Sequence, residues 1–295
     1  MRRATRERLY RLVENSVLRV HWGLSSREYL RELGAAYDVL WDAYQRGNVV
    51  VDYGAPGAAE AYRLHYLPHY AYMAFRGTAG LPAELLSKIA QSHLRLTSVA
   101  AGPFPEIIGL VEAAVTRGVE RGRIDATVYD INADVWMDAA RASVEIAADL
   151  VPGITVDLRL RRIDVREPPP ATLPAADVLT FQNCANEICH DGKPTAATLA
   201  FLRSVAPHGA VVLVDFNNYS NALQSIPRLE RWLRENGFRP LAVFDAQHEE
   251  RTPFGYPPGR TFYNFYGATA RPGGGYDKLR EPRQNLKFSW SVWSR

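Results

Sequence analysis

Apolar side chains recur at steps of three and four residues through the first 90 residues of the chain. This period predicts amphipathic helices over residues 5–90, each with one face turned toward a core. Ser25 or Ser26 is placed to cap the second helix, with Glu28 close behind in its first turn. The periodic positions are Leu9, Leu12, Val13, Val17 and Val20, and then Tyr29, Leu33, Ala36, Tyr37 and Leu40.

From about Leu94 the pattern changes to short apolar runs that alternate with helical stretches. Strands with a helix in each gap predict right-handed βαβ crossovers, and therefore a parallel sheet that is covered on both faces. The expected strands are residues 94–100, 126–130, 154–164, 177–181 and 210–216, and the expected helices are residues 105–120, 133–149 and 195–206.

The alternation continues toward the C-terminus. A further helix is expected over residues 226–236, and two more strands over residues 239–244 and 261–268. The polar segment 245–260 between those strands has the length of a functional loop. In residues 286–292 apolar and polar side chains alternate, which predicts a late edge strand.

These elements predict an α/β fold built on a doubly wound, seven-stranded, mostly parallel sheet. We expect a helical cap over residues 1–90 and a ligand-binding α/β domain over residues 91–295. The 47% hydrophobic and 23% charged content is that of an ordinary globular protein.

Charge and cysteine content narrow the class of protein. The net charge is only +3 and the basic residues form no stripe, so nucleic acid is not an expected partner. Cys184 and Cys189 are too few for a disulfide framework and have no second ligand pair for zinc, so we expect no metal. No apolar run is long enough to span a membrane, and we expect a cytoplasmic protein that is compatible with a homodimer.

The turn after the first strand contains Ala100, Ala101, Gly102 and Pro103. Small residues at this edge of a doubly wound sheet let the backbone approach a ligand, although the same turn can simply pack a helix on a strand. The second strand ends at Asp130, where a carboxylate can accept hydrogen bonds from a ribose.

Asp164, at the end of the third strand, can reach the exocyclic amine of an adenine, although a single Asp at a strand end is often only a cap. No phosphate-binding signature occurs in the first turn. Its absence favours a nucleoside without phosphates.

Residues 94–268 resemble the class I S-adenosylmethionine-dependent methyltransferases. The resemblance implies the Rossmann-like methyltransferase fold and S-adenosyl-L-methionine as cofactor. It places Ala100–Pro103 against the amino-acid part of the cofactor, Asp130 on the ribose and Asp164 at the adenine. The segment 182–187, which includes Asn183, matches the family's segment beside the sulfonium. Ser98 and Ala100 stand where the family usually has an acid and its first glycine.

A second likeness concerns the same turn. Residues 102–105, Gly-Pro-Phe-Pro, are similar to the Gly-Pro-hydrophobic-Pro turn of nicotianamine synthases. Those enzymes share the fold but transfer the aminocarboxypropyl arm of the cofactor. The fold also houses enzymes that close this arm into an azetidine ring.

An aromatic segment, residues 62–76, precedes the first strand. Pro68 should begin or kink a helix in which Tyr72 and Arg76 share a face. Tyr72 could hold a sulfonium by cation–π attraction and Arg76 could pair with the cofactor carboxylate, while Tyr66 and Tyr70 would contact substrate. The segment resembles the helical lid of several methyltransferase families, and half-buried packing is the alternative role for each aromatic residue.

Residues after the fourth and fifth strands are candidates for acting on the substrate. Asn186 can hold a nucleophile and Glu187 can orient or deprotonate it, unless Glu187 only caps the next helix. His190 and Asn217 would line the same site.

We therefore expect an enzyme, an S-adenosylmethionine-dependent transferase that methylates a small molecule beneath a helical cap. The first alternative uses the same cofactor for aminocarboxypropyl transfer or azetidine formation and releases methylthioadenosine. The second alternative is an RNA-binding methyltransferase-like protein, which the weak net charge disfavours.

Overall fold

The computed structural model of the chain describes residues 1, 3–19, 23–45, 51–190, 193–216, 222–244, 252–253 and 285–295. They divide into two compact units. One unit contains Tyr70–Arg251 and Leu286–Arg295, and the other contains Arg2–His69. No helix in these ranges combines the length and the apolar character needed to cross a membrane.

The second unit is helical, as the sequence predicts. It contains α1 (Arg3–Leu18), α2 (Ser26–Gln45) and the first half of α3 (Ala58–Ala79). Ser25 and Glu28 form the expected cap of α2, because the Ser25 N–H donates to Glu28 Oε2 at 3.0 Å and the Glu28 N–H donates back to Ser25 Oγ at 3.4 Å. The Tyr29 hydroxyl joins α2 to α1 through a 3.0 Å hydrogen bond to the Val17 carbonyl.

Helix α3 is continuous through Pro68, which lies inside it and does not begin it. The division between the two units falls within this helix, between His69 and Tyr70. The boundary expected near residue 90, between a cap and a ligand-binding domain, stays a prediction.

The first unit is built on a seven-stranded sheet with the order β3-β2-β1-β4-β7-β11-β8. β1 pairs in parallel with β2 and β4. Farther out, β3 pairs in parallel with β2, and β7 pairs in parallel with β4. β11 runs antiparallel to both neighbours. This confirms the predicted seven-stranded, mostly parallel, doubly wound sheet. The strands are β1 (Leu94–Val99), β2 (Gly122–Asp130), β3 (Ile154–Arg162), β4 (Val178–Gln182), β7 (Ala210–Phe216), β8 (Arg239–Phe244) and β11 (Phe288–Ser294).

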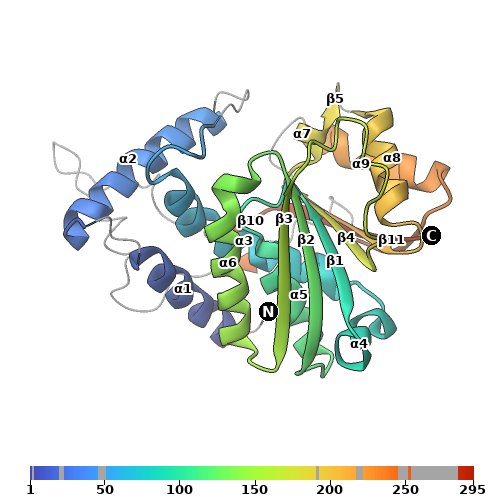
Figure 1. Cartoon of the computed structure of the whole chain (residues 1–295), viewed down its shortest axis with the longest axis horizontal. Helices are drawn as coiled ribbons and strands as arrows, with labels where there is room; N and C mark the ends of the chain where they lie inside the picture. The colour runs from blue at the N-terminus through green and yellow to red at the C-terminus, as the bar shows by residue number, and fades with distance from the viewer. Residues whose placement is uncertain are drawn as a thin grey trace. The chain divides into compact units, whose positions relative to one another are not determined.

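Helices cover both faces of this sheet (Figure 1). The second half of α3 lies close against one face, because a Cβ on Gly77 would come within 3.0 Å of Val212 and Val214 of β7. Helix α5 packs closely against α3, where Gly109 leaves room for the backbone of Phe75. The helices of this unit are α4 (Ala83–Gln91), α5 (Pro105–Thr116), α6 (Ala133–Leu150), α7 (Ala185–Ile188), α8 (Ala196–Val205) and α9 (Ala222–Glu235).

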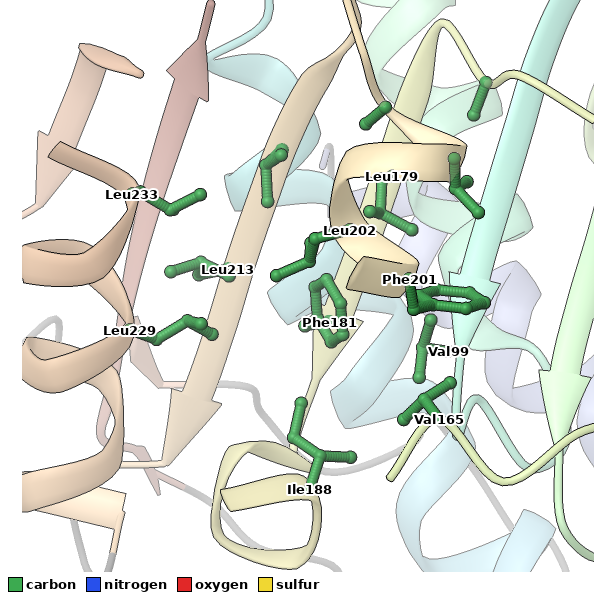
Figure 2. Close-up of a cluster of buried hydrophobic side chains, with 14 of the residues drawn as sticks. Val99, Val165, Leu179, Phe181, Ile188, Phe201, Leu202, Leu213, Leu229 and Leu233 are labelled. Atoms are coloured by element: carbon green, nitrogen blue, oxygen red, sulfur yellow. The ribbon is translucent and has the colours of Figure 1, made fainter. Parts of the chain in front are cut away.

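The opposite face holds the hydrophobic cluster drawn in Figure 2. Phe201 and Leu202 of α8 pack over the strands with Phe181 of β4, and Leu229 and Leu233 of α9 lie beside them. Full burial of such side chains contributes about 1.5–3 kcal/mol each.

The strand near the C-terminus differs from expectation. It was predicted as an edge strand, but β11 lies inside the sheet between β7 and β8. Its polar members, Ser289 and Ser291, are buried, and Ser291 accepts a 3.0 Å hydrogen bond from the indole of Trp293. Small hydroxyl side chains are therefore buried in an interior strand. An alternation of apolar residues with serine does not show that one side of the strand faces solvent.

The remaining short strands are β5 (Cys189–His190), β6 (Lys193–Pro194), β9 (Thr252–Pro253) and β10 (Asn285–Leu286). The strand expected over residues 261–268 lies outside the described residues, as does most of the loop expected over residues 245–260.

Candidate functional site

The topological switch point of the sheet lies between β1 and β4. These strands are neighbours, with Val99 opposite Phe181, and the chain leaves them toward opposite edges. In doubly wound sheets the loops that follow such strands bind the ligand, since they separate and leave a crevice at the carboxyl ends. The segments after Val99 and after Gln182 therefore define the candidate site.

The turn after β1 has an unusual backbone. Ala100, Gly102 and Phe104 have φ angles of 49°, 51° and 62°, in the left-handed region that non-glycine residues seldom adopt. The Ala100 N–H is held by the Tyr129 carbonyl at 2.8 Å, and the Phe104 N–H by the Ala101 carbonyl at 2.9 Å. Strain of this kind gathers at functional sites, where the surrounding structure maintains it.

Asp130 joins the end of β2 to this turn. Its Oδ2 accepts a hydrogen bond from the Gly102 N–H at 3.1 Å, and its Oδ1 accepts one from the Asn132 N–H at 2.7 Å. Burial raises the pKa of the carboxyl, and these two hydrogen bonds oppose the rise. The structure thus brings together Asp130 and the Ala100–Pro103 turn, and their roles at a cofactor stay predictions.

Asp164 lies two residues beyond the end of β3, next to Ile163, whose N–H donates to the Asp130 carbonyl at 3.3 Å. Its carboxylate is held by the Arg166 guanidinium, with contacts of 2.6 to 3.1 Å. This hydrogen bonding lowers the pKa of Asp164. The carboxylate is thus ionised and oriented, and its role at an adenine stays a prediction.

The segment after β4 contains a buried side-chain amide that has no partner among the described residues. Asn183 has a φ angle of 54°, and its N–H donates to the Val214 carbonyl at 2.9 Å. Among the described residues, nothing hydrogen-bonds to its side-chain Nδ2 or Oδ1, although both atoms are buried. An amide left unsatisfied costs about 1–3 kcal/mol, so this position suits a ligand that supplies the missing partners.

Gln182 and Cys184 tie this segment to its surroundings. Gln182 Nε2 donates to the Tyr70 carbonyl at 2.8 Å, and the Cys184 thiol lies 3.6 Å from the Val99 carbonyl. Cys184 is buried.

The predicted substrate-acting residues follow in α7 and β5. Asn186 and Glu187 lie in α7 and His190 ends β5, but the side chains of Asn186 and His190 are outside the described part of the chain. Asn217 is outside it entirely. Partial burial and repulsion by Asp130 raise the pKa of Glu187 to about 7, with Arg166 opposing. Because the residue is exposed, water screens part of this effect.

Two acidic residues at this edge were not selected from the sequence. Glu106, in the first turn of α5, is 1% exposed, and neither carboxyl oxygen bonds to another described residue. Asp215, near the end of β7, is 3% exposed; its Oδ1 accepts from the Phe216 N–H at 2.7 Å, while its Oδ2 has no partner among the described residues. An acid at a strand end was the criterion that selected Asp130, and it would also have found Asp215.

These carboxyl groups act on one another electrostatically. Asp130 raises the pKa of both Glu106 and Glu187, and Glu187 raises that of Asp215. Burial is the larger cause in each case, and it brings Glu106 to about 8 and Asp215 to about 7. The carboxyl end of the sheet is therefore acidic and poor in water. No group of three or more potential ligand residues in the described chain is arranged to hold a metal ion.

The aromatic helix contributes differently along its length. Tyr70 lies beside the site, because its ring centroid is 5.6 Å from that of Phe216 at the end of β7. Tyr72 is buried and its ring meets Phe288 of β11 edge-on at 6.2 Å, a packing contact. Arg76, one turn later, is half-buried. Tyr66 belongs to the other unit, where its ring lies 4.9 Å from that of Tyr62. Binding or catalytic roles for these residues stay predictions.

Solved structures with a similar arrangement include several methyltransferases. An O-methyltransferase family protein from Burkholderia thailandensis is 13% identical, with a TM-score of 0.44, and the match covers 92% of this chain and 74% of that one. A candidate class I S-adenosylmethionine-dependent methyltransferase from Listeria monocytogenes is 13% identical, with a TM-score of 0.43, and the match covers 100% of this chain and 88% of that one.

The plantazolicin methyltransferase BpumL, solved in complex with SAH, is 10% identical, with a TM-score of 0.41, and the match covers 91% of this chain and 99% of that one. No protein-family model matches the sequence, and no curated protein matches it.

Proposed function

We propose that this protein is an S-adenosylmethionine-dependent transferase that methylates a small molecule. The observation that carries the proposal is the acidic switch point, where Asp130 accepts a hydrogen bond from a strained turn and the buried Glu106 follows that turn directly.

The charge of the site selects among nucleoside ligands. Buried carboxyl groups favour a cationic ligand, which stabilises their ionised form, and disfavour the phosphates of a dinucleotide, which would repel that form. S-adenosylmethionine carries a sulfonium and an ammonium group and no phosphate. Asp130 keeps lone pairs available for ribose hydroxyls beyond its two backbone hydrogen bonds.

The other candidate residues would contact different parts of the cofactor. Residues 100–103 would face its amino-acid arm, Asp164 the adenine, and the unpartnered amide of Asn183 the region of the sulfonium. Asn186 and Glu187 would position the acceptor, since an in-line displacement mainly requires alignment of donor and acceptor. The net charge of +3, without a basic stripe, favours a small-molecule acceptor in a cytoplasmic setting.

Calorimetry with S-adenosylhomocysteine tests the cofactor. Asp130→Ala should weaken binding by about 1–3 kcal/mol, the range for a lost hydrogen bond to a charged group. Asp134→Ala is the matched control, because Asp134 is an exposed acid in the first turn of α6 and should leave affinity unchanged. Equal affinities for wild type and Asp130→Ala would remove Asp130 from the site.

A second candidate uses the same cofactor and breaks a different bond. Aminocarboxypropyl transfer or azetidine formation requires a nucleophilic amine that has lost its proton, and buried carboxyls with pKa values near 7, such as Asp215, can accept one. Product analysis separates the candidates. Methyl transfer yields S-adenosylhomocysteine, whereas either alternative yields methylthioadenosine.

A further inference from the structure

Glu106 is the most isolated acid among the described residues of the site. It is 1% exposed, and no other described residue hydrogen-bonds to either of its carboxyl oxygens. A polar group buried in this way lowers the stability of the protein. The N-terminus of α5 favours a negative charge, but by itself it offsets only part of that cost.

The end of β1 lacks the acid that the family resemblance leads one to expect. Ser98 occupies that region, and its hydroxyl is buried and bonded to the Thr180 hydroxyl at 2.6 Å. A serine hydroxyl is neutral, and this one is already paired with Thr180. Ser98 therefore offers no counter-charge to a ligand. Glu106 is the next acid along the chain, and it follows the strained turn directly.

We infer that Glu106 binds the ammonium group of the cofactor's amino-acid arm, in the place of the acid missing from the end of β1. The inference rests on the proposed function, because it names the residue that recognises one part of the proposed cofactor. A ligand ammonium supplies both the counter-charge and the hydrogen-bond donors that Glu106 lacks.

Other properties of the site agree with this role. Burial, together with the charge of Asp130, raises the pKa of Glu106 to about 8, and the residue's own backbone N–H opposes the rise. The carboxyl is therefore largely protonated at neutral pH without ligand, and a bound ammonium favours its ionised form. Glu106 lies in the first turn of α5, directly after the turn whose Gly102 N–H donates to Asp130, the ribose-binding candidate.

Three ligands isolate the ammonium contact. S-adenosylhomocysteine has both the ammonium and the carboxylate, 5′-deoxy-5′-(3-aminopropylthio)adenosine keeps only the ammonium, and 5′-methylthioadenosine has neither. Glu106→Gln should bind the first two about 10- to 100-fold more weakly than wild type, and methylthioadenosine equally well. Glu106→Asp keeps the charge on a shorter side chain and should retain part of the wild-type preference.

Glu112→Gln is the matched control, because Glu112 is also buried in α5 but takes part in a polar interaction. It should preserve the wild-type order of the three affinities. If Glu106→Gln keeps that order as well, Glu106 does not bind the ammonium, although the proposed function stands. If wild type binds none of the three ligands, the proposed function fails together with this inference.

Discussion

Buried acids lie at both ends of the central strands, and their surroundings differ. Asp177, just before β4, accepts hydrogen bonds from Lys88 Nζ at 2.8 Å and from the Arg95 N–H, Nε and Nη2 at 2.9, 3.1 and 3.1 Å. Burial alone would raise its pKa, but the hydrogen bonds outweigh burial and hold the pKa well below its usual range. At the carboxyl end, Glu106 is buried even more deeply and receives no such partners among the described residues.

The difference separates stability from function. At the amino end the protein supplies the cations itself, so the acid stabilises the fold without a ligand. At the carboxyl end, the oxygens of Glu106 and one oxygen of Asp215 have no partner among the described residues, which lowers the stability of the protein and leaves their lone pairs available. Proteins retain such unfavourable groups where a ligand completes them. The same side-chain chemistry therefore stabilises the fold at one edge, and we propose that it recognises a ligand at the other.

The largest effect is expected at the paired acid. Asp177→Asn should lower the free energy of unfolding by about 2–4 kcal/mol, since it removes the charge on which two cations converge. The half-exposed Lys88 and Arg95 can be hydrated afterwards, which limits the loss. Urea denaturation measures the change, and cofactor affinity of the folded protein should stay at the wild-type value.

Asp157→Asn provides the control for that measurement. Asp157 is 58% exposed and lies 2.8 Å from Arg123, so its ion pair is screened by water and should be worth less than about 1 kcal/mol. If the two variants lose the same stability, the network around Asp177 has no special weight and the comparison fails at the amino end.

Removing the charge of Glu106 should have the opposite effect and raise the free energy of unfolding. An unfolded Glu106 loses its proton near 4.5 and the folded one near 8, so between these pH values the folded protein binds more protons. The free energy of unfolding should therefore fall as pH rises from about 5 to 8. Glu106→Gln removes this dependence and should be about 1–2 kcal/mol more stable than wild type at pH 8.

Thermal unfolding across this pH range, without ligand, provides the measurement. Asp177 contributes the reverse slope at low pH, because its lowered pKa gives stability that is lost as pH falls through the acid range. A Glu106→Gln variant that is less stable than wild type at pH 8 would show that Glu106 supports the fold.

The sequence predicted the sheet because its information is local. Continuous apolar runs such as Ala210–Phe216 and Arg239–Phe244 have the observed bounds, and Asp130 could be chosen because it ends such a run. β11 was misplaced at an edge because serine is polar in sequence yet small enough to be buried beside Trp293.

The unpaired acid could not be recognised in the same way. A glutamate in the first turn of a helix is ordinary, since it favours the helix dipole wherever it is exposed. In the folded protein, however, α5 packs closely against α3 at Gly109, and Glu106 is only 1% exposed. Burial of this kind depends on residues distant in the sequence, and so does the absence of a partner.

Asp215 has one bonded and one unbonded carboxyl oxygen, and its substitution should change the free energy of unfolding least. Its Oδ1 is bonded to the Phe216 N–H at 2.7 Å, as in a structural acid, while its Oδ2 has no partner among the described residues. Asp215→Asn can keep the bonded oxygen and removes a carboxyl whose pKa is raised to about 7 by burial. At pH 8 we expect a gain of less than about 1 kcal/mol in unfolding free energy, measured by urea denaturation. A loss comparable to that of Asp177→Asn would instead place Asp215 among the acids that hold the fold together, and the functional edge would then begin at Glu106 and Asp130.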